Sequence, residues 1–275
     1  MTQAALQSGS DTWHARYGTT SVAPSLSPLI LDLLGHRSVR AFLDGPVDDA
    51  VLAQAVAAAQ SASSSSNLQA WSVVAVRERE KLRRLAELAG GQRHVAEAPL
   101  FLAWLVDWSR LRRLGVAQDH ATAGIDYLES YTVGVVDAAL AAQNAAVAFE
   151  RLGLGLVYIG GMRNQPEKVA SELGLPDGSF VLFGMCVGHP DPARPADIKP
   201  RLPQSVVLHH ERYDASLETA AVQVYDQTMT AFQRGQQRED RPWSQTAVER
   251  VGGPEALMGR DRLREALNAL GFPLL

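Results

Sequence analysis

Cationic and hydroxyl-bearing side chains gather in four short clusters along this chain. They occupy residues 36–40, the serine run 63–66, residues 92–94 and residues 199–201. The chain as a whole carries a formal net charge of -4, so the clusters do not follow from a basic composition. Arginine guanidinium groups bind phosphate through two parallel hydrogen bonds, and serine hydroxyls add further donors. The pattern therefore predicts a site for a phosphorylated ligand.

The spacing inside two of these clusters brings cations together. Arg37 and Arg40 are three residues apart and would share a face of a helical turn. Lys199 precedes a proline, which disfavours the helical conformation at that position, so an extended segment is expected there. Positions i and i+2 of an extended chain face the same side, which pairs Lys199 with Arg201. Each cluster alone would suit a solvated surface; together they favour a bound cofactor.

Two pairs of glycines have different meanings. Gly160 and Gly161 follow a predicted strand, where the absence of a β-carbon lets the backbone approach a flat ligand closely. Gly153 and Gly155 match the first two glycines of a dinucleotide fingerprint, but Tyr158 stands where the third belongs. They also follow a predicted helix and precede a strand, the reverse of the order in that fingerprint. A dinucleotide-binding turn is therefore rejected.

Several other classes of function find little support. The chain has neither a Gly-x-Ser-x-Gly nor a His-Glu-x-x-His motif. The adjacent His209 and His210 would point to opposite faces of a strand, so no metal site is predicted. Cys186 is the single cysteine and lies in an apolar segment, which indicates a buried, inert thiol. A pI near 6.0 argues against a nucleic-acid-binding protein.

The alternation of short β-branched runs with helical patterns predicts an α+β fold. Residues 1–27 are expected to form a weakly ordered extension, and residues 28–275 a single domain with a helical C-terminal excursion from about residue 205. Strands are predicted at 71–76, 99–106, 156–159 and 180–187, with an edge strand at 206–208. Helices are predicted at 28–34, from residues 46–49 to the serine run at 63–66, and at 80–88, 166–173, 217–233, 244–251 and 260–270, with one or two long helices over 119–152.

The longest apolar stretch, residues 131–149, contains Asp137, Gln143 and Asn144. A membrane-spanning helix needs about 20 predominantly apolar residues, so a buried helix explains this stretch better. The first thirty residues contain charged side chains and no compact apolar core of a signal peptide. We therefore expect a cytoplasmic protein.

In sequence order, the four clusters and the glycine pair resemble the nitroreductase family. The motifs are HRSVR at 36–40, SSSS at 63–66, GGQRHV at 90–95, YIGG at 158–161 and KPR at 199–201. The likeness covers roughly residues 28–245 and is closest to the oxygen-insensitive NADPH nitroreductase and flavin reductase branch. It implies FMN as cofactor, NADPH as electron donor and a homodimer with FMN at the subunit interface. It also implies a central mixed β-sheet flanked by helices, with a domain-swapped C-terminal segment.

The same resemblance implies roles for individual residues. Residues at the phosphate and ribityl end of FMN would be His36, Arg37, Ser38, Val39, Arg40, Lys199, Pro200 and Arg201. Residues from the partner subunit would be Ser64 and Ser66. Residues along the flavin ring would be Gln92, Arg93, His94, Tyr158, Ile159, Gly160 and Gly161. Arg234, with Arg40, would bind NADPH, although the helix before Arg234 is about two residues shorter than the family's spacing.

The function implied is a ping-pong, two-electron reduction of nitroaromatics, quinones or free flavin. No protein general acid or base is needed for hydride transfer to the flavin, because the cofactor carries that chemistry. Two alternatives stay open. One is a dedicated flavin reductase that supplies reduced FMN to a partner enzyme, and the other is a non-catalytic flavin- or nucleotide-binding protein.

Overall fold

The computed structural model describes residues 9–18 and 21–275. Predictions for residues 1–8 and 19–20, within the expected N-terminal extension, lie outside the described residues. The chain forms two compact units. The first unit contains the described residues up to Arg37 together with 197–257, and the second contains residues 38–196 and 258–275. Residues 258–275 thus belong to the second unit.

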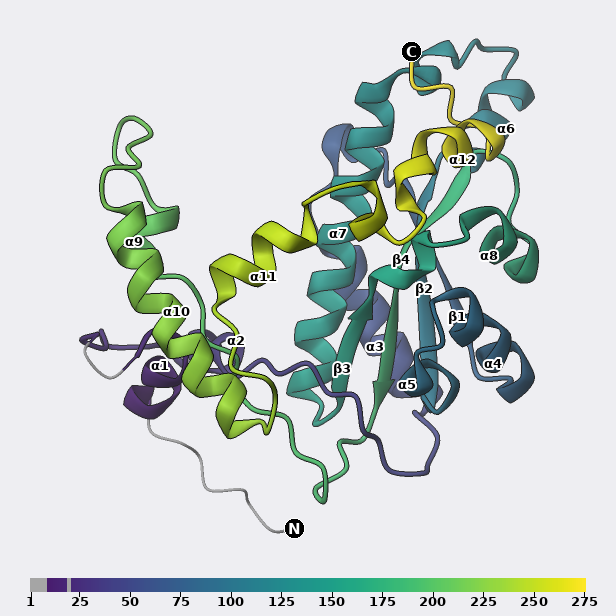
Figure 1. Ribbon diagram of the computed structural model, residues 1–275. Helices are drawn as coiled ribbons and strands as arrows, with labels where there is room; N and C mark the ends of the chain where they lie inside the picture. Colours follow the sequence, from purple (N-terminus) through teal and green to yellow (C-terminus); the bar gives the residue numbers. More distant parts are fainter. Residues whose placement is uncertain (1–8, 19–20) are drawn as a thin grey trace. The chain divides into compact units, whose positions relative to one another are not determined.

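The second unit is built on a four-stranded sheet with the order β1-β2-β4-β3 (Figure 1). Its strands are β1 Trp71–Val76, β2 Leu100–Asp107, β3 Gly155–Ile159 and β4 Ser179–Gly188. All three pairings are antiparallel. The one parallel contact described is an isolated bridge between Ser38 and Leu156 on the outer side of β3. The four predicted strands and the α+β class are confirmed.

The central strand β2 is buried along its whole length. Side chains alternate across a strand, so Leu100, Leu102 and Trp104 enter one core cluster. Phe101, Ala103 and Leu105 enter a second cluster on the opposite face. The continuous apolar run of residues 99–106 was predicted to form a strand that is buried on both faces, and this is confirmed.

Helices cover both faces of this sheet, with α3 and α7 on one side and α4, α5 and α8 on the other (Figure 1). The helices of the second unit are α3 Asp49–Gln60, α4 Arg79–Leu88, α5 Arg93–Ala96, α6 Ser109–Ala117, α7 Leu128–Arg151, α8 Pro166–Leu173 and α12 Leu263–Ala269. Helix α7 is long and apolar enough to cross a membrane. Its Ala141, Ala142 and Ala145 are instead buried in the sheet core, as predicted for a buried helix.

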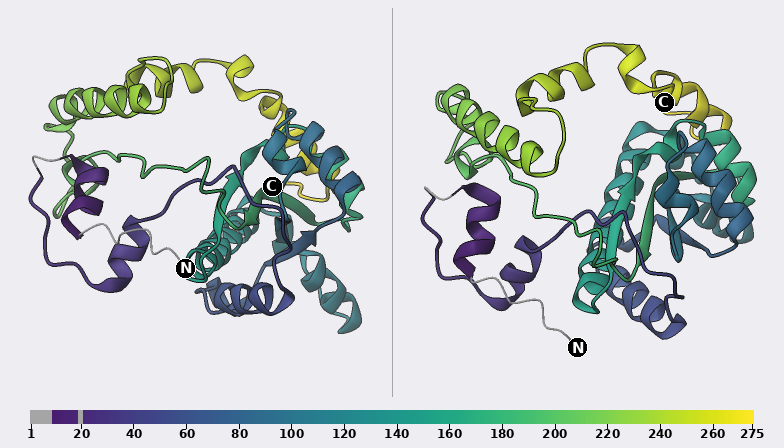
Figure 2. Two further views of the ribbon diagram at one scale, coloured as in Figure 1. Left: turned by 90° about the horizontal axis from the view of Figure 1, so that it is seen from below. Right: turned by 60° about the horizontal axis from the view of Figure 1, so that its bottom comes forward.

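The first unit is helical. Its helices are α1 Gly9–Tyr17, α2 Pro28–Leu34, α9 Gln204–Val207, α10 Glu218–Gly235 and α11 Trp243–Arg250. An extended segment at residues 197–203 runs between α1 and α10 (Figure 2). The Tyr225 hydroxyl of α10 fixes this segment by donating to the carbonyl oxygen of Pro200 at 3.0 Å. Trp243 then packs edge-on against Tyr225, with ring centroids 5.4 Å apart.

Three local differences from the sequence-based expectation have clear causes. The predicted edge strand at 206–208 is wrong, because the chain after Pro203 turns into α9. The Val206 amide donates to the Pro203 carbonyl at 3.0 Å, and the Leu208 amide to the Gln204 carbonyl at 2.8 Å. Helices α5 and α6 were not anticipated, since one is four residues long and the other follows directly after β2. Helix α1 lies in the extension, for which no element was expected.

Candidate functional site

In the first unit, the segment that carries Lys199 and Arg201 is extended. Ile198 and Pro200 are buried, whereas Lys199 and Arg201 are exposed. This alternation is the one expected when positions i and i+2 of an extended chain face the same side. The two cations are therefore presented together, and the buried Ile198 and Pro200 hold the segment against the unit.

Cationic side chains of the first unit line two cavities. Lys199 and Arg201 line a cavity of about 550 Å³. Arg37 lines a second cavity of about 330 Å³, beside the end of α10. Aromatic and long apolar side chains complete the larger one: Tyr17, Leu202, Val207, Tyr225, Met229 and Trp243. Cations at the rim of a partly apolar cavity suit a ligand with an anionic end and a carbon skeleton.

In the second unit, residues 38–40 run along the outer edge of β3. The Val39 amide donates to the Leu156 carbonyl at 2.9 Å, next to the Ser38–Leu156 bridge. Val39 is only 8% exposed, so its side chain belongs to the core. A β-carbon at Gly155 would come within 2.6 Å of the Val39 side chain. Close packing of Val39 on Gly155 thus fixes the strand edge from which Ser38 and Arg40 project.

Gln92 lies against the glycine pair at the end of β3. The Gln92 side-chain amide donates to the Ala89 carbonyl at 2.9 Å. A β-carbon at Gly161 would meet that same carbonyl at 2.5 Å and Gln92 Nε2 at 2.6 Å. Any larger residue at position 161 would collide with these atoms, so packing requires glycine at this buried position. The structure therefore brings together two residues, Gln92 and Gly161, that the sequence placed 69 positions apart.

The neighbours of Gln92 differ in their surroundings. Arg93 is exposed and donates to the Glu97 carboxylate at 2.6 Å, one helical turn away. His94 is half-buried, and burial together with the positive charge of Arg40 lowers the pKa of its imidazole below the usual value. A neutral His94 is thus favoured at neutral pH. Arg40 and His94, two of the predicted site residues, influence one another electrostatically.

Ile159 can offer only its backbone to a ligand, whereas the side chain of Tyr158 is partly exposed. Ile159 is 1% exposed and sits in the core between the sheet and α4. The Tyr158 ring packs edge-on against Phe183 at 5.1 Å, and its hydroxyl donates to Gln143 Oε1 at 3.3 Å. Burial raises the pKa of the Tyr158 phenol, which therefore stays protonated. The side chains position the strand end, and Gly160 and Gly161 open the short 3-10 turn that follows it.

The serine run forms a loop held in an unusual backbone conformation. Ser66, Asn67 and Gln69 all have positive φ angles, near 49°, 55° and 50°. Such angles are costly for residues other than glycine and persist where surrounding contacts enforce them. Ser66, Asn67 and Gln69 are exposed, so the strained part of the loop faces outward.

Asp137 of α7 supplies the contacts that hold this loop. The carboxylate is 2% exposed and accepts hydrogen bonds from Ser64 Oγ at 2.7 Å, the Ser65 amide at 3.3 Å and the Ala70 amide at 2.9 Å. Ser64 Oγ in turn accepts from the Gln69 amide at 2.8 Å. The proton of the Ser64 hydroxyl is therefore directed to Asp137, so this hydroxyl can act toward a ligand only as an acceptor.

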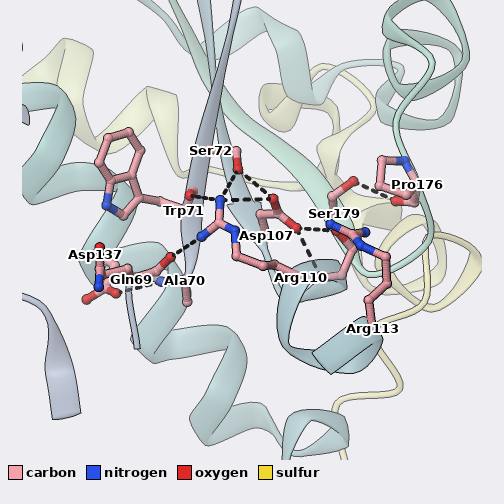
Figure 3. Close-up of polar contacts among 11 residues, drawn as sticks. Gln69, Ala70, Trp71, Ser72, Asp107, Arg110, Arg113, Asp137, Pro176 and Ser179 are labelled. Atoms are coloured by element: carbon pink, nitrogen blue, oxygen red, sulfur yellow. Dashed lines mark hydrogen bonds and ion pairs between the residues drawn. The ribbon is translucent and has the colours of Figure 1, made fainter. Parts of the chain in front are cut away.

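A second polar network braces the end of the loop from α6 (Figure 3). Arg110 donates to the Gln69 carbonyl at 3.0 Å and to Ser72 Oγ at 2.9 Å. Ser72 Oγ donates to the Asp107 carboxylate at 2.5 Å. Burial raises the pKa of Asp107, but hydrogen bonds from Ser109 and Ser72 outweigh it and hold the pKa below the usual value. The charged carboxylate thereby anchors both Arg110 and the start of β1.

Two arginines that the sequence did not single out lie beside Gly160. A β-carbon there would come within 3.4 Å of the Arg163 guanidinium and 3.9 Å of that of Arg260. Arg163 is half-buried and donates to the Leu182 carbonyl. The GGMR spacing could have indicated Arg163, which lies one helical turn after Gly160. No local signal could have indicated Arg260, which is 100 residues away along the chain.

Arg234 lies at the end of α10 in the first unit. It is exposed and forms an ion pair with Asp240, with its Nε donating to the carboxylate at 3.1 Å. The hydrogen bond to Asp240 raises the pKa of the guanidinium further. A phosphate group that binds Arg234 would have to compete with this carboxylate.

Comparison with known proteins gives a consistent picture along nearly the whole chain. Residues 33–189 match the nitroreductase family, and residues 199–275 match the C-terminal domain of the nitroreductase family. The chain is 41% identical over 246 residues to NADPH-flavin oxidoreductase of Vibrio harveyi, covering 87% of this chain and 96% of that protein. It is 42% identical over 221 residues to oxygen-insensitive NADPH nitroreductase of Salmonella typhimurium, covering 80% of this chain and 89% of that protein.

Solved structures agree with these similarities. NfrA2 of B. megaterium has a TM-score of 0.84 at 36% identity, covering 91% of this chain and all of that chain. NADPH:FMN oxidoreductase from Vibrio harveyi, complexed with NAD+, has a TM-score of 0.79 at 38% identity, covering 90% of this chain and 99% of that chain.

Proposed function

Because the chain belongs to the nitroreductase family, we propose that it is an FMN-dependent NAD(P)H oxidoreductase that reduces small acceptors by two electrons. The observation that carries this function is the contact of Gln92 with Gly161. Gly161 is buried against Gln92 and Ala89, and the half-buried Gly160 before it has the guanidinium groups of Arg163 and Arg260 nearby, which suits the edge of a flat, electron-accepting ring.

The chemistry of the available donors fits FMN. Arginine, lysine and hydroxyl groups at 36–40 and 199–201 suit the phosphate and ribityl chain, with His36, Arg37, Ser38 and Val39 on one segment and Lys199, Pro200 and Arg201 on the other. Gln92 and the backbone of residues 158–161 suit the edge of the flavin ring. FMN, when bound, accepts hydride from the nicotinamide cofactor and passes both electrons to the acceptor.

The protein's own residues then stabilise charge. Arg163 and Arg260 place positive charge beside Gly160, where negative charge on the reduced ring or on an acceptor oxygen would be stabilised. His94, kept neutral by burial and by Arg40, can donate or accept one hydrogen bond without adding charge. Arg93 remains a proposed ligand of the site, although its guanidinium pairs with Glu97. Arg234 and Arg40 are proposed to bind NADPH.

The proposal includes the assembly and its location. We propose a cytoplasmic homodimer with FMN at the subunit interface, in which the C-terminal excursion wraps around the partner. The strained loop supports an intermolecular role, because Ser66 is exposed and its conformation is fixed in advance by Asp137. Ser64 would accept a hydrogen bond from the partner's side of the site, and Ser66 would present its hydroxyl.

One measurement tests the function directly. The purified protein should be yellow, and NADPH added without oxygen should bleach the flavin absorbance, which a nitrofuran or quinone should then restore. A colourless protein that takes up no FMN on reconstitution would overturn the proposal. Retained colour without NAD(P)H oxidation for any acceptor would indicate the non-catalytic alternative.

A dedicated flavin reductase is the second candidate, because two relatives from Bacillus subtilis are named FMN reductases. Such an enzyme would turn over free FMN much faster than nitrofurans at saturating NADPH. Steady-state kcat/KM values for the two acceptors, measured with the same preparation, separate the two functions.

A further inference from the structure

Helix α1 lies outside the part of the chain that resembles the nitroreductase family. The family matches begin at residue 33, whereas α1 spans Gly9–Tyr17. The helix is nevertheless anchored firmly within the first unit. Trp13 is 8% exposed, its indole donates to Ser21 Oγ at 3.0 Å, and its ring packs on Tyr17 with centroids 4.5 Å apart.

The most buried charge of this helix is Arg16, which is 4% exposed. Its guanidinium donates three short hydrogen bonds to carbonyl oxygens: to Leu34 at 2.8 Å, to His36 at 2.6 Å and to Lys199 at 2.7 Å. Burial of a charge is costly unless hydrogen bonds satisfy it, and the planar fork of arginine provides several fixed donors at once. Three separate donations explain how Arg16 is tolerated inside the unit.

The contacts of Arg16 join two segments that are distant in sequence. Leu34 and His36 flank the end of α2, and Lys199 lies more than 160 residues later. The backbone of α1 adds a further link, since the Arg201 amide donates to the Arg16 carbonyl at 2.8 Å. One residue thus fixes the main chain at His36, Lys199 and Arg201.

These are the segments whose side chains are proposed to bind the FMN phosphate. A cation that must be ordered when the ligand binds loses conformational entropy at that step, which lowers affinity. A main chain that is fixed beforehand removes part of this cost. The guanidinium of Arg16 itself donates to these backbone carbonyls, so the role we assign to it is to hold other residues in place.

We propose that Arg16 is a positioning residue that holds His36, Lys199 and Arg201 in place for the phosphate of the cofactor. Helix α1 places Arg16 against these segments. This inference rests on the proposed function, because it assumes that these residues bind FMN. Helix α1 would then contribute to the cofactor site through Arg16.

The test compares FMN with riboflavin, which lacks the phosphate. Dissociation constants of both flavins for the full-length apoprotein, measured by flavin fluorescence, should change selectively in Arg16→Met. We expect the FMN dissociation constant to rise by about tenfold or more while that of riboflavin stays unchanged. Arg16→Lys keeps one charge without the fork and should give a smaller rise.

Arg77→Met is the control, since Arg77 also donates to a backbone carbonyl, that of Val47 at 3.1 Å, but belongs to the second unit and pairs with Asp49. It should leave the FMN-to-riboflavin ratio as in the wild type. If Arg16→Met fails to fold, Arg16→Lys decides the question. An unchanged ratio in the folded variant would overturn the inference, as would an equal loss of both flavins.

The wild-type protein separates this failure from failure of the proposed function. If it bound no flavin, or bound FMN no better than riboflavin, the proposed phosphate site would be wrong. If it preferred FMN and the Arg16 variants kept that preference, only the inference about Arg16 would fall.

Discussion

The side-chain amide of Gln92 fills the space that a β-carbon at Gly161 would need, because its Nε2 would lie only 2.6 Å from that carbon. The Ala89 carbonyl on the same side is equally close, at 2.5 Å. The glycine is therefore required by packing before any ligand binds. Its neighbour Gly160 has only the flexible end of the Arg163 side chain within 3.4 Å. The two glycines offer a matched pair for experiment.

Gly161→Ala should destabilise the apoprotein by about 1–3 kcal/mol, because a methyl group forces Gln92 and the Ala89 backbone apart. Gly160→Ala should cost clearly less, since the Arg163 end can shift. Urea unfolding without FMN measures both values free of any ligand effect. Equal costs for the two variants would show that the contact with Gln92 is not what demands glycine.

Asp137→Asn should destabilise the protein by about 1–3 kcal/mol, because one carboxylate oxygen that accepts backbone or hydroxyl hydrogen bonds becomes an amide donor. The loss of stability should be greatest in the loop, where amide hydrogen exchange at residues 64–70 should become faster. FMN binding should also weaken. Asp44→Asn, at an exposed position, is the control and should change neither quantity. Unchanged exchange in the loop of Asp137→Asn would contradict the role assigned to this carboxylate.

Removal of both cations by Lys199→Ala with Arg201→Ala should raise the FMN dissociation constant by at least about tenfold, since hydrogen bonds to charged groups contribute about 1.5–3 kcal/mol each. Riboflavin binding should change little. Arg212→Ala with Arg238→Ala removes the same charge from two other exposed positions of the first unit. Gel filtration followed by visible absorbance reports retained FMN, and equal loss in both double variants would point to a general charge effect.

Much of this fold could be predicted because its signals are local. The apolar run at β2 and the alanine-rich pattern of α7 each indicate an element without reference to the rest of the chain. The edge strand expected at 206–208 failed because Val206 and Leu208 carry the same β-branched and apolar signal in a helical turn after Pro203. Helix α1 has a weak apolar pattern, and its buried Arg16 is stabilised by carbonyls that only the folded chain brings near.

The residues of the candidate site also fall into two groups, those that local sequence could predict and those that depend on tertiary contacts. The paired presentation of Lys199 and Arg201 followed from the geometry of proline. The sequence predicted a close backbone approach to a ligand at Gly161, whereas the structure shows packing against Gln92 and Ala89 as the reason for glycine there. The proximity of Arg260 to Gly160 and the donation of Ser64 to Asp137 depend on tertiary contacts, which no spacing along the chain expresses.

Arg234 and Asp240 should have opposite effects on NADPH. Arg234→Ala removes a cation proposed to bind NADPH and should raise the KM for NADPH by about tenfold, with FMN retained. Asp240→Asn removes the competing carboxylate from Arg234 and should lower that KM. NADH kinetics are the control, because a contact to the extra phosphate leaves NADH unaffected. An unchanged KM for NADPH in Arg234→Ala would place NADPH recognition elsewhere.

His94 should make stability depend on pH. Burial and the Arg40 charge lower its pKa in the folded protein, with Glu97 opposing them weakly. The unfolded chain, with a pKa of about 6.5 at this residue, then binds a proton more readily than the folded protein. Stability from this group is thus fully present above about pH 6.5 and is lost as the pH falls below it. The urea concentration at the midpoint of unfolding should decrease when the pH is lowered from 7.5 to 5.5, and this decrease should be smaller in His94→Gln. An identical pH dependence in the variant would show that another group is responsible.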